Sequence, residues 1–194
     1  GGVKMGIELI VFAVVAVAIV LMYNSLISKK NEIENAVGGV HTFLQKRADL
    51  IPSLVATVKQ FAAHEEKLLT ELTAARAAVQ RPLQAMQEDG ALQSADSMLS
   101  QAFGRVVAVA ENYPELRSNE NFLSLQGSLN EIEGQLSAAR RTYNAAVVRY
   151  NNAVESIPTN IVAGLLGYRR KSVFQVAPEA AAKPDIAKLF GQVG

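Results

Sequence analysis

The sequence contains no cysteine and no tryptophan, and only two of its 194 residues are histidines. The missing cysteines exclude disulfides, zinc–thiolate sites and thiol nucleophiles. With so few histidines, a catalytic metal would need mostly carboxylate ligands. The formal net charge of +1 gives no sign of the strongly basic surface of a nucleic-acid-binding protein. Ala, Leu, Val, Gln and Glu are abundant, and this composition favours α-helices over a β-sandwich.

A long uncharged segment stands near the start of the chain. Leu9 to Met22 is an unbroken apolar run, and no charge occurs between Glu8 and Lys29. About twenty apolar residues suffice to cross the hydrocarbon core of a bilayer as a helix. The segment therefore predicts a single transmembrane helix over residues 9–28, preceded by a short flank over residues 1–8.

Three other interpretations fit this segment less well. A cleavable signal peptide needs a small-x-small site after its apolar core, whereas Ala16-Val17-Ala18 lies inside the run. Gly6 to Val11 is similar to the N-terminus of a type IV pilin, but nothing downstream alternates with the period of the strands in a pilin head. The third is a buried helix of a soluble protein.

The charges at the two flanks of the segment indicate its orientation. Lys29 and Lys30 outnumber Lys4, which predicts the large domain on the cytoplasmic side; a margin of one charge leaves the periplasmic side open.

An apolar stripe runs from Leu26 to Val79 at alternating steps of four and three residues. Thirteen of its sixteen positions are apolar, and only Lys30, Arg47 and Glu65 interrupt it. This is the period of a helix that buries one stripe against partner helices. The stripe predicts one helix over about residues 26–80, continuous with the membrane helix. Because two shorter helices cannot cover so long a stripe, part of it is expected to contact another subunit.

Pro52 interrupts this predicted helix, because proline lacks a hydrogen-bond donor and disturbs the preceding turn. One interpretation ends a helix near Lys46 and restarts it with Asp49 as the N-cap. The other keeps a single kinked helix. The stripe stays in phase across the proline and no glycine offers a tight reversal there, so the kink is favoured.

Two further apolar stripes predict helices over residues 91–112 and 120–157. The helix predicted over residues 120–157 is expected to begin at a cap provided by Ser118 or Asn119. The predicted fold class is therefore all-α. A single N-terminal transmembrane helix continues into a long antiparallel bundle, coiled-coil-like and of three to four helices, over residues 29–157.

A short apolar run and a basic triplet lie in the C-terminal segment, residues 158–194. The simplest interpretation is a cap over the end of the bundle with solvated charges; contact with a neighbouring subunit or with lipid is the functional alternative. A continuous helix over 26–80 would place the run far from the bilayer and favour a subunit. A reversal at Asp49-Pro52 would place it at the membrane surface. The remaining tail is predicted to be a loosely held extension. The candidate contact residues are Ile161, Val162, Leu165, Leu166, Tyr168, Arg169, Arg170 and Lys171.

Several short motifs recur in order along the chain, and the longest is Lys46-Arg47-Ala48-Asp49-Leu50-Ile51-Pro52. The sequence resembles the LemA family of bacterial membrane proteins, whose most distinctive signature is an Arg-x-Asp-Leu-Ile-Pro-x-Leu-Val core. The resemblance implies a protein of the bacterial inner membrane, in a family that includes a magnetosome-membrane member. The positions that match are Tyr23, Asn24, Arg47, Asp49, Leu50, Ile51, Pro52, His64, Glu65, Tyr113, Pro114, Arg140, Tyr143, Asn144, Tyr150 and Asn151.

No catalytic arrangement is recognisable in the sequence. His64-Glu65 begins like the helix of a zinc protease, but the second histidine at i+4 is missing. The i,i+2 carboxylates of Glu131 and Glu133 point to different helix faces. Arg47 and Glu65 on the stripe are expected to pair with each other, to set register against a neighbour, or to lie at exposed ends of a shifted stripe. We therefore predict no catalytic residues, no cofactor, no metal and no small-molecule substrate.

The function predicted from these features is that of a non-enzymatic, membrane-anchored scaffold. It would self-associate in the bacterial inner membrane and organise the envelope or recruit partner proteins. Its expected partners are the lipid bilayer, further copies of itself and other membrane proteins, but not nucleic acid. Two alternatives are an accessory subunit of a membrane protease or transport complex and a lipid-binding module that remodels membranes.

Overall fold

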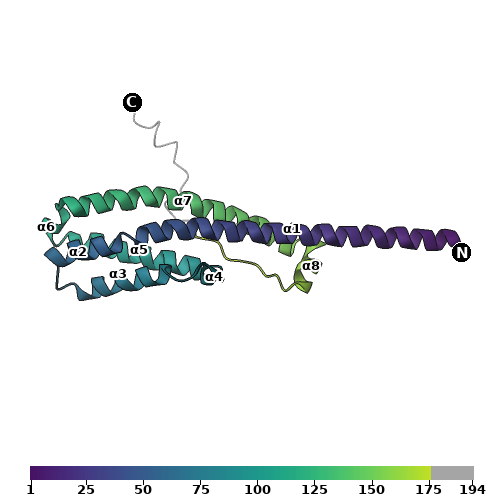
Figure 1. The fold of residues 1–194 in the computed structure, drawn as a ribbon, viewed down its shortest axis with the longest axis horizontal. Helices are drawn as coiled ribbons and strands as arrows, with labels where there is room; N and C mark the ends of the chain where they lie inside the picture. Colours follow the sequence, from purple (N-terminus) through teal and green to yellow (C-terminus); the bar gives the residue numbers. More distant parts are fainter. Residues whose placement is uncertain (176–194) are drawn as a thin grey trace, which may run out of the picture.

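The computed structural model describes residues 1–175. Within this part of the chain the protein is all-α and contains no β-strand. One helix projects from a long antiparallel bundle (Figure 1). The fold class predicted from the sequence is confirmed. The predicted extended tail lies beyond residue 175, outside the described residues.

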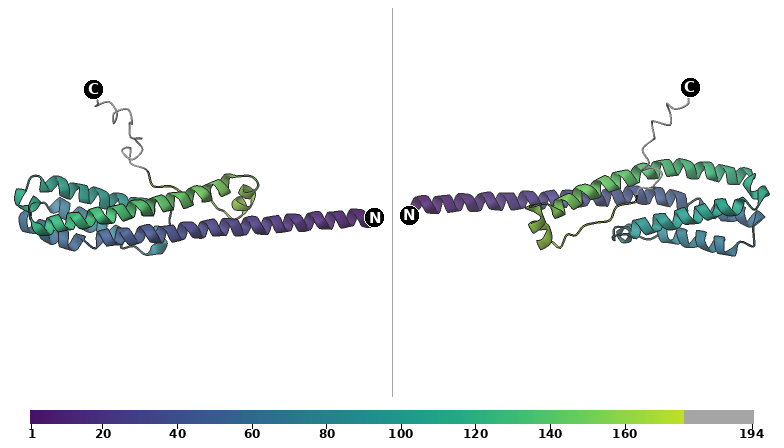
Figure 2. Two further views of the ribbon diagram at one scale, coloured as in Figure 1. Left: turned by 90° about the horizontal axis from the view of Figure 1, so that it is seen from above. Right: turned by 180° about the vertical axis from the view of Figure 1, so that it is seen from behind.

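The projecting helix is α1 (Gly2–Ala48), and no residue of its N-terminal half, residues 2–25, is buried; Met22 alone of this half packs against the cluster around Leu26. This half is long and apolar enough to cross a membrane, and none of its apolar span is buried. The first buried residue of the chain is Leu26. Figure 2 shows the bare half leaving the bundle in a straight line. A long apolar helix that no protein surface covers is the arrangement expected of the predicted transmembrane segment.

The second helix, α2 (Ile51–Phe61), continues in the direction of α1 across a short break (Figure 1). Asp49 and Leu50, between the two helices, both keep right-handed helical dihedral angles. The N–H of Asp49 still donates to the carbonyl of Gln45 at 2.8 Å. Pro52 stands in the first turn of α2, where its missing donor does no harm. The predicted kink is confirmed, and Asp49 does not serve as an N-cap.

The chain reverses between α2 and α3 (Glu66–Val79), so the prediction of one helix over residues 26–80 is wrong from Ala62 onward. Ala62 (φ −137°, ψ 49°) and Glu65 (φ −82°, ψ 56°) leave the helical region and make the turn. Neither glycine nor proline marks this turn in the sequence. The bundle therefore has one more reversal than the sequence pattern indicated.

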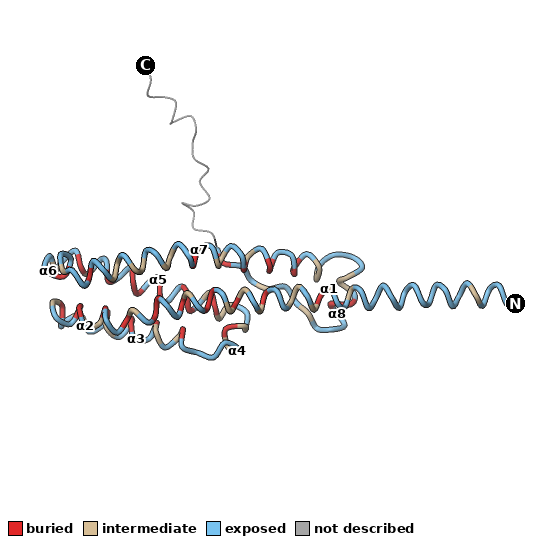
Figure 3. Tube along the Cα trace, turned by 45° about the horizontal axis from the view of Figure 1, so that its top comes forward, coloured by how far each residue is buried: buried red, intermediate tan, exposed pale blue. Residues whose placement is uncertain are grey.

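The apolar stripe from Leu26 to Val79 is covered within the chain. α3 packs against α5 (Ala91–Ala110), and α1 packs against α7 (Glu120–Glu155). The short helices α4 (Leu83–Met86) and α6 (Pro114–Arg117) lie in the connections. Figure 3 shows the buried residues along the facing sides of these helices. Every apolar position of the stripe is buried except Phe61, which is half-buried. The expectation that part of the stripe is left for another subunit is wrong.

The two later helices begin and end close to their predicted limits, 91–112 and 120–157. Asn119 caps α7, because its Oδ1 accepts the N–H of Phe122 at 3.1 Å. α7 runs back towards the bare half of α1, and α8 (Thr159–Leu165) follows it (Figure 1). The additional reversal thus inverts the direction expected for this helix. The C-terminal apolar run lies at the membrane end of the bundle and not far from it.

Candidate functional site

The end of the bundle nearest the bare half of α1 is formed by α8. Val162 and Ala163 on one face of α8 pack against Leu26 of α1, which is fully buried. The other face presents Ile161 and Leu165, which are 63% and 85% exposed. The helix contains no charged residue. It is therefore apolar on two faces, of which α1 covers one.

After α8 the chain runs back along α7 as an extended strap, residues 169–174. Asn151 of α7 makes two hydrogen bonds to Lys171, donating to its carbonyl and accepting its N–H, both at 2.9 Å. Asn144 makes the same pair to Phe174, at 2.9 and 2.8 Å. Seven residues of helix rise about 10.5 Å, and three residues of extended chain span about 10 Å. The spacing of the two asparagines therefore matches the spacing of the backbone groups that they bind.

The tyrosines that precede these asparagines complete the surface under the strap. The O–H of Tyr143 donates to the carbonyl of Ser172 at 3.1 Å, and its ring meets that of Phe174 edge-on, with centroids 5.2 Å apart. Tyr150 packs against Tyr168, with ring centroids 6.3 Å apart. Burial raises the pKa of both Tyr143 and Tyr150 above the ordinary value. Both family-type Tyr-Asn pairs thus hold the C-terminal segment in place.

The middle of the strap is also fixed to the turn between α4 and α5. The carboxylate of Asp89 accepts the N–H of Ser172 at 2.9 Å and its O–H at 3.0 Å. Gln93, in the first turn of α5, donates to the carbonyl of Ser172 at 3.1 Å. Gly90 adopts φ 80°, a left-handed conformation that glycine tolerates, where the chain enters α5. The strap therefore connects α8 to both α5 and α7.

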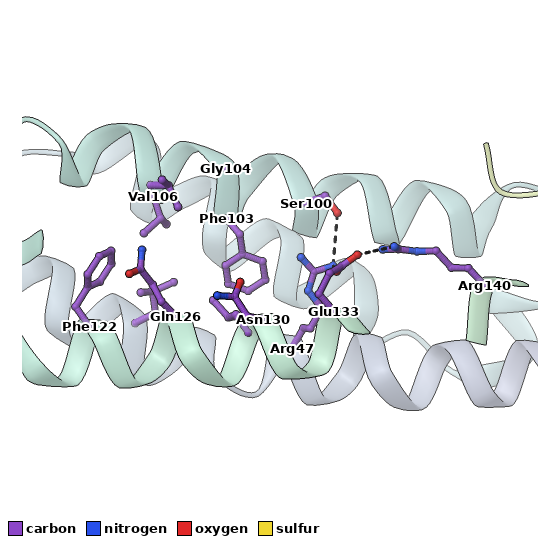
Figure 4. A pocket seen from close by; sticks show the side chains of 13 residues that line it. Arg47, Ser100, Phe103, Gly104, Val106, Phe122, Gln126, Asn130, Glu133 and Arg140 are labelled. Carbon is purple, nitrogen blue, oxygen red and sulfur yellow. Dashed lines mark hydrogen bonds and ion pairs between the residues drawn. The ribbon is translucent and has the colours of Figure 1, made fainter. Parts of the chain in front are cut away.

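Arg47 and Arg140, two positions of the family signature, form a partly buried ionic cluster with Asp96 and Glu133. Figure 4 shows Arg47, Glu133 and Arg140 of this cluster. Nη1 of Arg47 lies 3.3 Å from a carboxylate oxygen of Glu133 and 3.6 Å from one of Asp96. Arg140 donates to both carboxylate oxygens of Asp96, at 2.9 and 2.6 Å, and to Glu133 at 2.7 Å. The guanidinium of Arg47 also lies 5.1 Å from the ring centroid of Phe103. Two cations and two anions thus join α1, α5 and α7.

The two arginines of this cluster are held differently. Burial lowers the pKa of Arg47, and the nearby carboxylates of Glu133 and Asp96 offset this only in part. Burial acts on Arg140 in the same direction, but its hydrogen bonds to Asp96 and Glu133 outweigh it and raise the pKa. A cleft of about 460 Å³ opens beside the cluster, with Phe122 on its apolar side. Because the four charges sum to zero and bind one another, the cluster is a set of structural salt bridges between the helices and not a binding site for a charged ligand.

A third contact closes the far end of the bundle. Glu65, at the turn between α2 and α3, accepts a hydrogen bond of 3.0 Å from the O–H of Tyr113. This hydrogen bond raises the pKa of Tyr113 above its ordinary value. Pro114 begins α6 directly after this tyrosine. Arg47 and Glu65 have separate partners, so the predicted pairing of these two residues is wrong, as is their placement at exposed ends of the stripe.

The other predicted positions differ in their surroundings. Within the family signature, Ile51 is buried and Leu50 is half-buried, while Tyr23, Asn24, Asp49, Pro52 and His64 are exposed. Of the candidate contact residues, Val162 is buried, Tyr168 and Lys171 are half-buried, and Ile161, Leu165, Leu166, Arg169 and Arg170 are exposed. Among residues 1–175 no group of three side chains is placed to hold a metal ion.

Sequence reasoning missed the roles of Asp96, Glu133 and Ser172 as partners of residues in the family signature, and that of Asp89 as the partner of Ser172. Most of these contacts join residues far apart along the chain: Arg140 and Asp96 are separated by 44 positions, and Asp89 and Ser172 by 83, whereas Glu133 lies seven positions from Arg140 on the same helix. The one usable signal was the Tyr-Asn pair repeated seven residues apart on α7, since such a repeat places both pairs on one helix face.

Comparison with known proteins gives a consistent result. A sequence model of the LemA family matches residues 36–187. The magnetosome protein MamQ 2 of Paramagnetospirillum magneticum is 28% identical over 207 residues, covering 94% of this chain and 76% of that protein. The magnetosome protein MamQ of Magnetospirillum gryphiswaldense is 24% identical, covering 100% of this chain and 80% of its own length. Protein LemA of Metamycoplasma hominis is 21% identical over 86% of this chain and 74% of its own.

Proposed function

Because the chain belongs to the LemA family, we propose that it is a non-enzymatic scaffold that self-associates in the bacterial inner membrane and organises the envelope or recruits partner proteins. The bare apolar half of α1 and the named relatives together suggest a membrane protein, and none of those names is that of an enzyme. The observation that supports the proposal best is the contrast between a self-sufficient bundle and this uncovered helix. Because the apolar stripes of the bundle helices are covered within one chain, the uncovered membrane helix is the part of α1 through which copies would associate.

Small residues along one face of α1 support such an association. At 100° per residue, Gly6, Ala13 and Ala16 lie within about 80° of one another around the helix. None of these three residues is buried. Transmembrane helices associate through faces of small residues, because their backbones can then approach closely. This face of α1 is the proposed contact between copies.

The experiment compares two matched substitutions on opposite faces of the membrane helix. Ala16→Leu places a large side chain on the proposed contact, whereas Ala18→Leu makes the same change about 160° away. Light scattering of the detergent-solubilised wild-type chain should give a particle mass greater than that of a monomer. The A16L substitution should lower this mass, and the A18L substitution should leave it unchanged.

A wild-type chain that is monomeric in mild detergent would exclude self-association. Equal behaviour of the two variants would remove the small-residue face from the proposal. If the purified particle instead contained a foreign protein in fixed ratio, the chain would be an accessory subunit of a membrane complex and not a self-associating scaffold.

A further inference from the structure

We propose that α8 is a second membrane contact of this chain, and that it lies among the anionic headgroups of the leaflet from which α1 emerges. The inference does not depend on self-association, because the contact lies within one copy. Four observations support it: the level of α8 along α1, its uncovered apolar face, the charges around it, and its fixed position.

The level of α8 is set by its contact with α1. Met22 and Leu26 of α1 pack in the same cluster as Val162 and Ala163 of α8. The uncharged segment of α1 ends at Lys29, three residues after Leu26 and thus about 4.5 Å further along the helix. α8 therefore lies where α1 passes from hydrocarbon to headgroups. Figures 1 and 2 show it crosswise to α1 at this end of the bundle.

The uncovered face of α8 is formed by large aliphatic side chains. Ile161 and Leu165, one helical turn apart, are 63% and 85% exposed, and Ile157, in the turn that precedes the helix, is 85% exposed. The polar side chains of the helix itself are those of Thr159 and Asn160. These two lie in the first turn, and a helix face of large aliphatic side chains is ordinarily buried. Because the bare half of α1 fixes a bilayer at the same level, the bilayer is the apolar phase within reach of this face.

Cations gather where the headgroups of that leaflet would be. Arg169, Arg170 and Lys171 follow the end of α8 after three intervening residues, and α1 adds Lys29 and Lys30. The Nζ of Lys30 lies 5.8 Å from the ring centroid of Tyr168, and Lys30 and Lys171 line one cleft.

The acidic groups facing these cations are fewer. Glu34 lies 3.7 Å from Lys30, and Glu155 lies 2.6 Å from Arg170. The remaining positive charge at the membrane surface complements anionic lipids.

The position of α8 is fixed before any lipid is present. Asn151 and Asn144 hold the strap that follows it, and Asp89 holds the middle of that strap. The apolar face and the basic residues therefore face the bilayer as one preformed surface, without the ordering entropy that a disordered segment would lose on binding.

The absence of native tryptophan allows the contact to be measured directly. Leu165→Trp places a single fluorophore on the exposed face of α8 in the full chain, and Ile161→Trp repeats the test one turn away. Leu123→Trp is the matched control, because Leu123 is 51% exposed near the start of α7, at the far end of the bundle. Each variant is reconstituted into vesicles of phosphatidylcholine and phosphatidylglycerol with or without lipids brominated near the headgroup.

Bromine should quench L165W and I161W and leave L123W unchanged. Failure to quench either α8 variant would overturn the proposal. A blue-shifted emission that bromine does not quench, and that grows with the protein-to-lipid ratio, would also overturn it, by assigning the face to a second copy.

Charge reversal tests the preference for anionic lipid. The double substitution Arg169→Glu and Arg170→Glu, made in the L165W chain, should reduce quenching several-fold in vesicles containing phosphatidylglycerol. It should have little effect in pure phosphatidylcholine. Circular dichroism checks that the bundle is unchanged. Equal quenching before and after reversal in the anionic vesicles would refute the role of the basic residues.

Discussion

Replacing Asn151 with alanine should release the strap from α7 without unfolding the bundle. Asn151 is 4% exposed and makes both of its hydrogen bonds to the backbone of Lys171. Alanine keeps the helix but offers neither a donor nor an acceptor. Asn144 still binds Phe174, so the strap should open near Lys171 and stay attached further along.

The expected size of this effect follows from the two hydrogen bonds. A hydrogen bond contributes a net stabilisation of about 1 kcal/mol, so the pair contributes about 2 kcal/mol. At 25 °C this corresponds to a roughly thirtyfold increase in the equilibrium constant for opening of the strap. The change should be local, because the helices pack through apolar residues that Asn151 does not support.

Amide hydrogen exchange measures this opening at single residues. In the N151A chain the amide of Lys171 should exchange roughly thirtyfold faster than in the wild type, while amides in the middle of α7 keep their protection. Asn152→Ala is the matched control, because Asn152 is the exposed neighbour on the same helix. Its strap amides should exchange at the wild-type rate.

Two results would refute this reasoning. Unchanged exchange at Lys171 in the N151A chain would mean that the asparagine does not hold the strap. Loss of protection throughout α7 to the same extent would mean that the strap is part of the cooperative core and cannot open by itself.

Three further predictions concern other parts of the bundle. The pKa of Tyr113 is raised above its ordinary value of 10.0, so its hydrogen bond to Glu65 stabilises the fold fully below pH 10.0 and stops doing so as the pH rises through the raised pKa. In thermal unfolding, the Y113F chain should therefore lose less stability at alkaline pH than the wild type does. Arg140→Lys loses the two-pronged bond to Asp96 and should lower the free energy of unfolding by about 2 kcal/mol in urea titrations, whereas Arg141→Lys on the exposed face should change it little. Since the chain has no native cysteine, His64→Cys can report sidedness: an impermeant thiol reagent should label it only after spheroplasts are permeabilised, and direct labelling would place the bundle on the periplasmic side.

The membrane helix, α5 and α7 could be predicted because their signals are local and long. Each is a stretch of roughly twenty or more residues with an unbroken apolar run or stripe. The predicted limits of 91–112 and 120–157 differ from α5 and α7 by two residues at the C-terminal end.

The reversal between α2 and α3 could not be predicted from the same pattern. Val58 and Leu68 stand ten residues apart, a heptad and a three-residue step, so the stripe passes through the turn in phase. α2 and α3 both pack against the same core, so each helix needs an apolar stripe whether the chain continues straight or reverses between them. The turn is held by a hydrogen bond from the N–H of Glu65 to the carbonyl of Ala62, by the burial of Ala62, and by the hydrogen bond between Glu65 and Tyr113, which are 48 positions apart.

The candidate site was also predictable only in part, because some of its signals are local in the sequence and others depend on residues that are distant in the chain. The apolar run and the basic triplet were visible as sequence, but their level relative to the bilayer depended on the number of reversals before them. Arg47 and the Tyr-Asn pairs were visible as family positions. Their roles depended on partners such as Asp96 and the backbone of Lys171, which only the folded chain brings near.

The continuity of α1 and α2 has a mechanical consequence. From Leu26 to Phe61 the chain advances in one direction over about 50 Å, at 1.5 Å per residue. A change of 10° in the tilt of the membrane helix would therefore displace the far turn sideways by about 9 Å, if the kink stays rigid. Bilayer thickness governs such tilt, and α8, set to one side of α1, would resist it in one direction more than in others. The far end of the bundle would then move by an amount and in a direction that depend on the thickness of the surrounding bilayer.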